Sequence, residues 1–425
     1  MRAKCRAVGK CVYALLKMLG NTGGNIMSEG LTESEKFVNS ISERAFLSLW
    51  THPNPIGKKG KELCDCLIVC GNHIVIISVK DIKYKNTGDE AGWKRWIKAA
   101  IDKSASQIWG AERWLNTAVE FTRHDGREVE LPPKENRIIH RVSVSLGAQR
   151  KIMTKSGDLG NGIVHVCDEF SLGAIFGLLD TVTDFVVFLT EVESLISRAN
   201  IIFSGGGIED LLAIYLLNNH SFPYERADLL VIDDTIFKGF IDSDDYKAIQ
   251  ESYSTSYFWD KLIEHFVDDL LTDGMFEYGT NEVTKNQLAL IQMALQPRGF
   301  RANLSDSFLE FLQKPELKIA ARVVLGYQNT AFVFHLGPSS DREARVQELG
   351  LRCLVVRGRL PDGEIVVGIS RDKLGPSKVG YSHDIAYVEI SESEWDEELE
   401  QQVTNIQKEL GYFENASWNR KPQNA

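Results

Sequence analysis

The chain has 425 residues, of which 43% are hydrophobic and 25% are charged, and its formal net charge is -11. The length predicts two or three domains, and the composition excludes fibrous and wholly disordered classes. The negative charge excludes a basic nucleic-acid coat but not a local basic groove, because phosphate binding depends on where the cations lie. No run of about 20 apolar residues occurs, so the sequence predicts no membrane-spanning helix.

Residues 1–26 combine Lys and Arg with a short apolar segment that Lys17 interrupts. No clean small-residue cleavage site follows, so we expect a disordered extension rather than a secretory signal. Seven cysteines are scattered along the chain. Cys64, Cys66 and Cys70 share a strand parity that suits a thiolate site, but no second cluster completes four ligands. We therefore expect small buried hydrophobes in a reducing, cytoplasmic protein.

Residues 32–50 are predicted to form an amphipathic helix. Thr32 and Glu35 have the spacing of a capping box, and apolar residues then recur every three or four positions. Pro53 and Pro55 are expected to end the helix before a basic loop.

Residues 61–81 place charged side chains on an apolar surface. Two runs rich in Val, Ile, Leu and Cys flank a Gly-Asn turn at 71–72, which predicts a β-hairpin. The register then sets Asp65 opposite Ser78 and diagonal to Lys80, all on one face of the hairpin. Buried charges need a partner, a metal or water. A salt bridge at the end of a core hairpin is the simplest account, and a functional site is the alternative.

Residues 93–115 are predicted to form a long helix on which Lys103 and Gln107 share a face. From 57 to 103 the chain has ten Lys or Arg and six Asp or Glu, a local balance of +4 that suits a polyanion. The tryptophans at 93 and 96 are expected either to stack on bases or to cap the core. The cations expected to bind nucleic acid are Lys58, Lys59, Lys61, Lys83, Lys94, Arg95, Lys98 and Lys103.

A further hairpin and a strand are predicted before residue 149. Residues 119–123 and 128–131 flank a His-Asp-Gly turn, and residues 140–146 alternate between polar and apolar side chains. We expect these segments to extend the central sheet to four or five strands, so that residues 27–149 form the first domain.

Residues 150–316 are predicted to form a mainly helical domain. Glycines at 205–207 precede a helix with Glu209 and Asp210 in its first turn. Because these acids would repel phosphate, a flexible connector is expected rather than a phosphate loop. An ionisable cluster around Asp168 is expected to cap the next helix rather than to bind metal.

Residues 317–412 are predicted to form an α+β module, and residues 413–425 a flexible tail. Its charged residues form no pattern that indicates catalysis. The expected strands are 318–325, 330–336, 353–356, 364–369 and 385–390, and the expected helices are 341–349 and 394–410.

The charged hairpin resembles that of the PD-(D/E)xK nuclease superfamily, the restriction-endonuclease-like proteins, over residues 31–145. In that superfamily one acid lies on a strand and an acid-x-Lys triplet lies on the next strand. The resemblance implies an α/β fold with a mixed sheet flanked by helices, in which Asp65 binds a divalent metal and Lys80 orients or activates the attacking water. The triplet here is Ser78-Val79-Lys80. Ser78 thus stands where the second acid is usual, although families of this superfamily tolerate replacement or migration of that acid.

The resemblance assigns two more residues to the site. Many of its families lend a carboxylate from the helix before the site, which makes Glu43 the candidate metal ligand beside Asp65. Several branches place a Gln on the helix after the Lys strand, a position that Gln107 matches, although Ala111 stands where the RecB-like pattern has a Tyr. Oxygen ligands suit Mg²⁺ or Mn²⁺.

The function implied by the resemblance is a metal-dependent nuclease that hydrolyses phosphodiester bonds of DNA, with RNA as the alternative substrate. By analogy at the level of the fold, restriction and anti-phage defence are the expected settings. Nucleic acid is the expected partner, alongside a protein partner or a second copy of the chain, and no membrane. The alternative, which Ser78 favours, is an inactive nuclease-fold protein that binds nucleic acid or protein. A third interpretation is that the hairpin is ordinary core in a protein of unrelated function.

Overall fold

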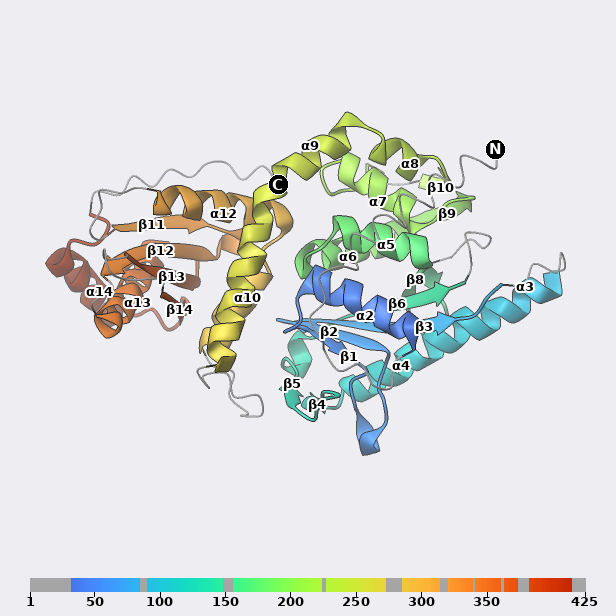
Figure 1. The fold of residues 1–425 in the computed structure, drawn as a ribbon, viewed down its shortest axis with the longest axis horizontal. Helices are drawn as coiled ribbons and strands as arrows, with labels where there is room; N and C mark the ends of the chain where they lie inside the picture. The colour runs from blue at the N-terminus through green and yellow to red at the C-terminus, as the bar shows by residue number, and fades with distance from the viewer. Residues whose placement is uncertain are drawn as a thin grey trace. The chain divides into compact units, whose positions relative to one another are not determined.

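The computed structural model describes the chain in several segments and divides it into two compact units, residues 1–250 and 251–425 (Figure 1). The extension at 1–26 and nearly all of the tail at 413–425 lie outside the described residues. The described segments are 32–84, 90–147, 156–223, 227–272, 285–313, 320–338, 341–360, 363–373 and 382–414.

The first unit is a mixed α/β structure. Its elements are α2 (Glu33–Phe46), β1 (Thr51–Pro53), β2 (Cys66–Cys70), β3 (His73–Asp81), α3 (Glu90–Ile97), α4 (Lys103–Leu115), β4 (Glu120–Thr122), β5 (Glu128–Glu130), β6 (Ile138–Leu146), β7 (Gly157–Asp158), β8 (Ile163–Cys167), α5 (Glu169–Leu178), α6 (Val182–Arg198), β9 (Ala199–Ser204), α7 (Ile208–Leu217), β10 (Ala227–Asp233), α8 (Ile236–Ile241) and α9 (Asp244–Ser252), the last of which crosses the division between the units. Short 3-10 turns lie at η1 (Lys58–Gly60) and η3 (Lys134–Asn136), and a π-turn, η2 (Lys98–Asp102), joins α3 to α4.

The main sheet of the first unit has the strand order β1-β2-β3-β6-β8-β7. Strands β1, β2 and β3 pair antiparallel, whereas β3, β6 and β8 pair parallel, which makes the sheet mixed. Helix α4 packs on one face of the sheet, and α2 and α5 cover the other (Figure 1). Because both faces are covered, β2 and most of β3 are buried, in line with their nearly continuous apolar sequences.

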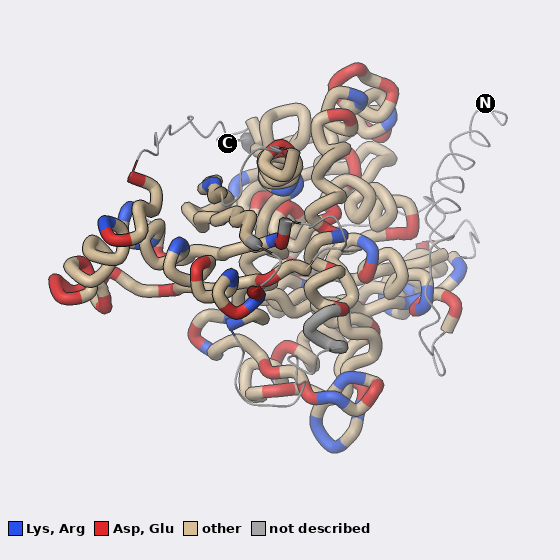
Figure 2. The backbone as a smooth tube through the Cα atoms, turned by 60° about the vertical axis from the view of Figure 1, so that its left-hand side comes forward, with Lys and Arg blue, Asp and Glu red and all other residues tan. Residues whose placement is uncertain are grey.

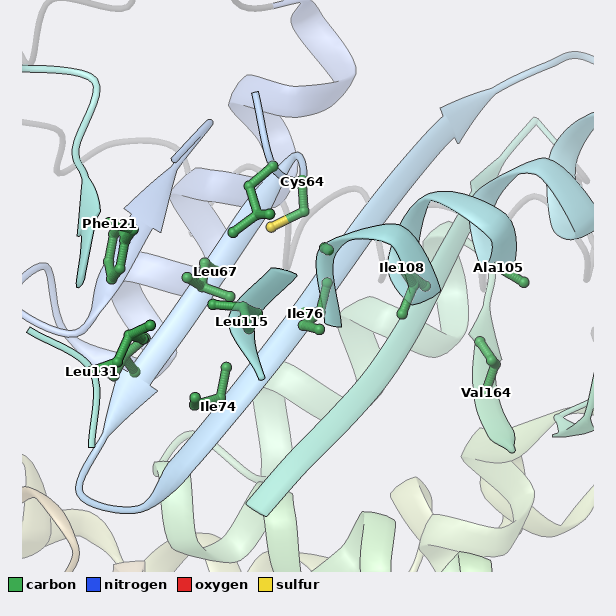
Figure 3. Close-up of a cluster of buried hydrophobic side chains, with 13 residues drawn as sticks. Cys64, Leu67, Ile74, Ile76, Ala105, Ile108, Leu115, Phe121, Leu131 and Val164 are labelled. Atoms are coloured by element: carbon green, nitrogen blue, oxygen red, sulfur yellow. The ribbon is translucent and has the colours of Figure 1, made fainter. Parts of the chain in front are cut away.

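The core under α4 joins alternate residues of the hairpin to one stripe of the helix. Leu67, Ile74 and Ile76 of the sheet pack against Ile108 and Leu115 of α4 (Figure 3). Every second side chain of the strands faces the helix side chains that recur every three or four residues, as the sequence predicted.

The predicted sheet was correct in kind but not in all its strands. The segments at 120–122 and 128–130 do pair as a hairpin, but β4 and β5 form a small sheet of their own. The main sheet instead continues through β8, which pairs with β6 beyond the boundary predicted at residue 149. Helix α2 ends at Phe46, before the prolines, and Thr51–Pro53 pairs with β2 as β1.

The second unit is an α+β module preceded by helices. Its elements are η4 (Ser254–Ser256), α10 (Tyr257–Thr272), α11 (Lys285–Ala294), α12 (Arg298–Leu312), β11 (Ala320–Leu325), η5 (Tyr327–Asn329), β12 (Ala331–Pro338), α13 (Arg342–Arg359), β13 (Ile365–Lys373), β14 (His383–Glu389) and α14 (Glu397–Leu410). The sheet order is β11-β12-β13-β14, with β12 and β13 parallel and joined by α13. Helices α10–α12 therefore belong to this unit and not to a separate domain ending at residue 316.

The strand predicted at 353–356 is wrong, because those residues lie inside α13. Cys353 and Val356 are fully buried against Val333 and Val366 of the sheet. A short apolar run occurs both in buried strands and on the buried side of helices, so periodicity could not distinguish the two structures. No helix among the described residues combines the length and the apolar character needed to cross a bilayer.

Candidate active site

The β2–β3 hairpin has the predicted register, with Leu67 opposite Ile76 and Cys70 opposite His73. The ladder of paired residues ends where β2 begins, at Cys66 opposite Ile77. One step further, the carboxylate of Asp65 accepts a hydrogen bond from the backbone N–H of Val79 at 2.6 Å. Beyond the last backbone pair of the ladder, the acceptor for the β3 backbone is therefore a side-chain oxygen of Asp65 instead of a backbone carbonyl of β2. This bond fixes Asp65 beside the carboxyl end of β3.

Lys80 follows Val79 and reaches the same place. Its Nζ lies 3.9 Å from Oδ2 of Asp65 and donates hydrogen bonds to Oε1 of Gln107 at 2.8 Å and to the carbonyl of Val79 at 3.0 Å. The Lys80 side chain is 26% exposed, whereas that of Asp65 is 6% exposed. The Lys80 side chain is therefore partly open to solvent, while that of Asp65 is nearly covered.

Gln107 of α4 connects the helix to the hairpin. Its Oε1 also accepts a hydrogen bond from the hydroxyl of Ser78 at 3.1 Å, and Ser104, one turn earlier, donates from Oγ to the carbonyl of Ser78 at 3.3 Å. Because two donors converge on one amide oxygen, the Gln107 side chain is held in one orientation. The structure thus brings together Asp65, Ser78, Lys80 and Gln107, the four residues expected at the site on the hairpin and the following helix.

Carboxylates crowd around this group. Burial raises the pKa of Asp65, opposed by the Val79 hydrogen bond, the Lys80 charge and the Ser78 hydroxyl. Burial also raises the pKa of Glu62, and the charges of Asp65 and Glu35 raise it further. Mutual repulsion among carboxylates marks a place where a cation would be favoured. In the described part of the chain, however, no three His, Cys, Asp or Glu side chains are grouped closely enough to hold a metal ion.

The helix carboxylate near the site is Glu35 rather than Glu43. The first turn of α2 lies at the carboxyl end of β3, where the hydroxyl of Ser34 donates to Asp81 at 2.5 Å. Glu43 lies in the last turn of α2 and would reach the site only if that end of the helix approached it. Burial raises the pKa of Glu43, the charge of Arg123 opposes that rise, and the charge of Glu43 acts in turn on Cys66.

In the sequence, Glu35 is marked only as the partner of Thr32 in a capping box and not as a residue of the site. The structure forms that box, since the Glu35 carboxylate accepts from the Thr32 N–H at 2.8 Å. Glu62 lies four residues before β2, and in the sequence it carries no signal beyond being one of six acids between 57 and 103. Ser104 lies three residues before Gln107 and was not singled out, although helical spacing places both on neighbouring faces.

The cations expected to bind nucleic acid are all exposed. Lys94 makes a surface ion pair with Glu90 at 2.8 Å. Figure 2 shows Lys and Arg on the loop around η1, at the bottom of the view. The exposed set is Lys58, Lys59, Lys61, Lys83, Lys94, Arg95, Lys98 and Lys103. Trp96, by contrast, is buried and donates from Nε1 to the carbonyl of Ile82 at 2.6 Å, so it belongs to the core.

The other ionisable groups singled out in the sequence have structural partners. The carboxylate of Asp168 accepts from the N–H groups of Phe170 and Ser171 at 3.0 and 2.8 Å and caps α5, as expected. The cysteines at 64, 66, 70, 167 and 353 are buried, in line with the role of small hydrophobes.

The glycines at 205–207 differ from the expected flexible connector. Asp210 is fully buried, and its carboxylate accepts from the N–H groups of Gly207 at 3.0 Å and Phe237 at 2.9 Å. A Cβ at Gly206 would lie 2.0 Å from Oδ2 of Asp210. Glycine is therefore required because the backbone packs directly on a buried carboxylate.

Comparison with family models, with curated proteins and with solved structures finds no match for this chain.

Proposed function

We propose that the protein is a metal-dependent nuclease that hydrolyses phosphodiester bonds of DNA, with RNA as the alternative substrate. The observation that carries the proposal is the position of Lys80, whose side chain is partly exposed and whose ammonium group lies 3.9 Å from the carboxylate of Asp65 and 2.8 Å from the amide oxygen of Gln107. An acid, a lysine and a glutamine from three neighbouring elements converge there, beside an exposed basic surface.

The order of the elements supports the resemblance to the restriction-endonuclease-like arrangement. Helix α2 precedes the site, Asp65 stands at the start of β2, Lys80 near the end of β3, and Gln107 on the helix that follows. These are the places that the PD-(D/E)xK resemblance implies for the first acid, the lysine and the glutamine. The analogy is one of fold, and the chemistry depends on the residues of the site.

An ordinary core salt bridge accounts for the site less well. The Lys80 ammonium lies 3.9 Å from Asp65, further than its hydrogen-bond partners at 2.8 and 3.0 Å. A pair that served only to neutralise buried charge would be expected in direct contact, since close geometry offsets the cost of desolvation. The Lys80 ammonium is thus held more closely by Gln107 and the Val79 carbonyl than by the Asp65 carboxylate.

Ser78 leaves the place of the second acid without a carboxylate, and Glu62 and Glu35 are the candidates to replace it. Both are coupled electrostatically to Asp65, and carboxylate oxygens are ligands that Mg²⁺ and Mn²⁺ prefer. On this proposal Asp65 and either glutamate would hold a hard divalent cation through their carboxylate oxygens. Such a cation would supply Lewis-acid stabilisation of the charge that develops on a phosphoryl group.

The side chains around Lys80 would orient the attacking water and the phosphate. Hydrolysis adds water across the ester: its oxygen bonds to phosphorus, the bond from phosphorus to the sugar oxygen breaks, and a proton passes to that oxygen. Lys80 is placed to donate a hydrogen bond to the attacking water or to a phosphoryl oxygen, and Gln107 fixes the direction of its ammonium group. The exposed cations would hold the phosphate backbone by charge alone.

One observation favours a second candidate, a nuclease-fold protein without activity that binds nucleic acid or protein. Ser78 is fully buried and bonded to Gln107, so the position of the usual second acid is filled by a satisfied hydroxyl group. Magnesium separates the two candidates. The enzyme is expected to gain thermal stability with Mg²⁺ and to lose that gain in Asp65→Ala, whereas the binding module is expected to show no gain.

The direct test is incubation of circular and linear plasmid with the protein and Mg²⁺ or Mn²⁺. Lys80→Ala is expected to lower the cleavage rate by about 100-fold or more, the usual range for a group that assists proton transfer. Lys247→Ala is the matched control, because Lys247 is an exposed lysine paired with Asp244 on α9. Equal loss of plasmid with the wild type and with Lys80→Ala would remove the assignment. Restriction or anti-phage defence, a cytoplasmic location and a protein partner or second copy remain parts of the same proposal.

A further inference from the structure

Three exposed lysines on the helical segment α3–η2–α4 lie on one continuous ridge that ends at Gln107. The spacings are four residues from Lys94 to Lys98, five from Lys98 to Lys103, and four from Lys103 to Gln107. Residues four apart on an α-helix are surface neighbours. In a regular α-helix the step of five would turn Lys103 about 140° away from Lys98.

The π-turn removes that break. Lys98–Asp102 is a π-helical turn, in which hydrogen bonds close between residues five apart. Lys103 therefore follows Lys98 in the same row, as a residue four positions on would in an α-helix. The ridge stays continuous across the irregularity, and we name the set Lys94, Lys98 and Lys103 the lysine ridge.

The lysine ridge is free to meet a ligand because the opposite side of the helix is packed. Ala100, Ser104 and Ile108 are fully buried, whereas all three lysines are exposed. Lys94 pairs with Glu90, but both side chains are more than 70% exposed, at 72% and 80%. An exposed ion pair of this kind is weak and salt-sensitive, so a phosphate can compete for the lysine.

The lysine ridge leads to the candidate active site, because Gln107 accepts hydrogen bonds from both Lys80 and Ser78. We propose that the phosphates of one nucleic-acid strand lie along this ridge and that the strand enters the site beside Gln107. The inference rests on the proposed nuclease function and adds the path of the substrate. From Lys94 to Gln107 the helix rises about 20 Å, enough to contact several successive phosphates. Lysine contacts phosphate as a point charge, so the track is independent of base sequence.

The test measures binding of a fluorescent single-stranded oligonucleotide to the full chain in EDTA over a series of salt concentrations. Without divalent cation the assay reports binding and not cleavage. Loss of three phosphate contacts in Lys94→Ala/Lys98→Ala/Lys103→Ala is expected to reduce the slope of log K against log salt by about 2, since each contact to a single strand contributes about 0.7. Arg113→Ala is the matched control, because Arg113 is an exposed cation of α4 that lies off the lysine ridge.

A charge exchange separates the position of the cation from net charge. Asp102 and Lys103 are adjacent and both exposed, so Asp102→Lys/Lys103→Asp keeps the composition but moves the cation about 100° around the helix. The exchange is expected to reduce the slope at least as much as Lys103→Ala. Wild-type slopes in the triple variant or in the exchange would overturn the inference, as would failure of the wild type to bind. Neither result depends on cleavage, whereas Lys80→Ala tests the proposed function through the rate of plasmid cleavage, so the two failures are distinguishable.

Discussion

The amide oxygen of Gln107 accepts a hydrogen bond at 2.8 Å from the ammonium group of Lys80, 27 positions away on another element. The same oxygen accepts the hydroxyl of Ser78 at 3.1 Å. Gln107 therefore acts as a brace between α4 and β3, and it sets where the Lys80 charge points. Helix and sheet would pack without this amide, since Ile108 and Leu115 already join the core.

Removal of the brace is expected to affect activity more than stability. In Gln107→Ala, Lys80 loses one of its two closest hydrogen-bond partners and its ammonium group becomes free to rotate. We expect the plasmid cleavage rate to fall by about 10- to 100-fold, as for other residues that orient a catalytic group. The free energy of unfolding should fall by only about 1 kcal/mol, the net value of a typical hydrogen bond. A cleavage rate within twofold of wild type would show that Lys80 acts without Gln107, and Gln401→Ala on α14 controls for loss of a surface amide.

Metal binding is expected to depend on Glu35 or Glu62 and not on Glu43. Glu35→Gln preserves the capping box, because Gln serves at that position as well as Glu. At 100 times the dissociation constant, Mg²⁺ should stabilise the wild type by about 2.7 kcal/mol. Thermal unfolding with and without Mg²⁺ should show this gain reduced in Glu35→Gln or Glu62→Gln and unchanged in Glu43→Gln. Loss of the gain in Glu43→Gln alone would restore the original sequence assignment.

The sequence was sufficient where a local rule decides the structure. Strand alternation and the Gly-Asn turn fix the register of the hairpin, and Gly71 adopts a φ of +56° at that turn. Helical spacing was enough to place Gln107 toward the lysine strand. Both features are determined by residues close by in the sequence.

The sequence was insufficient where the answer depends on how elements pack. Choosing between Glu35 and Glu43 requires knowing which end of α2 approaches β3, and both residues lie in the same amphipathic helix. That β8, and not the β4–β5 hairpin, extends the main sheet depends on parallel pairing between distant segments. Short strands carry no information about which partner they will join.

Stability is expected to fall at acidic pH through His140. Burial lowers the pKa of His140 from 6.5 to about 3, and the neighbouring charges of His73, His165 and Arg141 act in the same direction, opposed by Glu193. Below pH 6.5 the unfolded chain therefore binds a proton that the folded chain does not. The stabilising contribution is complete above pH 6.5 and is lost as the pH falls toward 3, by up to about 1.4 kcal/mol per pH unit.

Hydrogen-exchange protection of the β6 amides at pH 7.5 and pH 5, corrected for the intrinsic exchange rate at each pH, measures this loss. For His140 alone, the wild type should lose about 2 kcal/mol between the two conditions, and His140→Gln should lose correspondingly less. His124→Gln is the control, because His124 is exposed on the β4–β5 turn and is expected to leave the wild-type difference unchanged. An equal pH dependence in the wild type and His140→Gln would contradict the prediction.

The second unit is expected to depend on Asp260, which joins α10 to α12. Its carboxylate accepts from Nη1 of Arg298 at 2.7 Å and from Nη1 of Arg301, and both arginines are only 2% exposed. Arg298 also lies over the ring of Tyr257, with 4.5 Å from Cζ to the ring centroid. Two buried cations on one carboxylate form a network in which removal of the shared partner is more damaging than removal of either cation.

Asp260→Ala is therefore expected to destabilise the second unit by about 3 to 5 kcal/mol, because it removes the carboxylate that two buried guanidinium groups share. Hydrogen exchange of the α10 and α12 amides is the suitable measurement, since a whole-chain unfolding curve need not be two-state for two compact units. Asp244→Ala provides the control, as Asp244 is almost fully exposed and pairs with the exposed Lys247. Asp260→Asn should fall between the two, because it keeps the shape of the side chain but lacks the charge. Unchanged protection in Asp260→Ala would mean that the arginines are held by their backbone partners, which for Arg301 include the carbonyl of Gln296 at 2.8 Å.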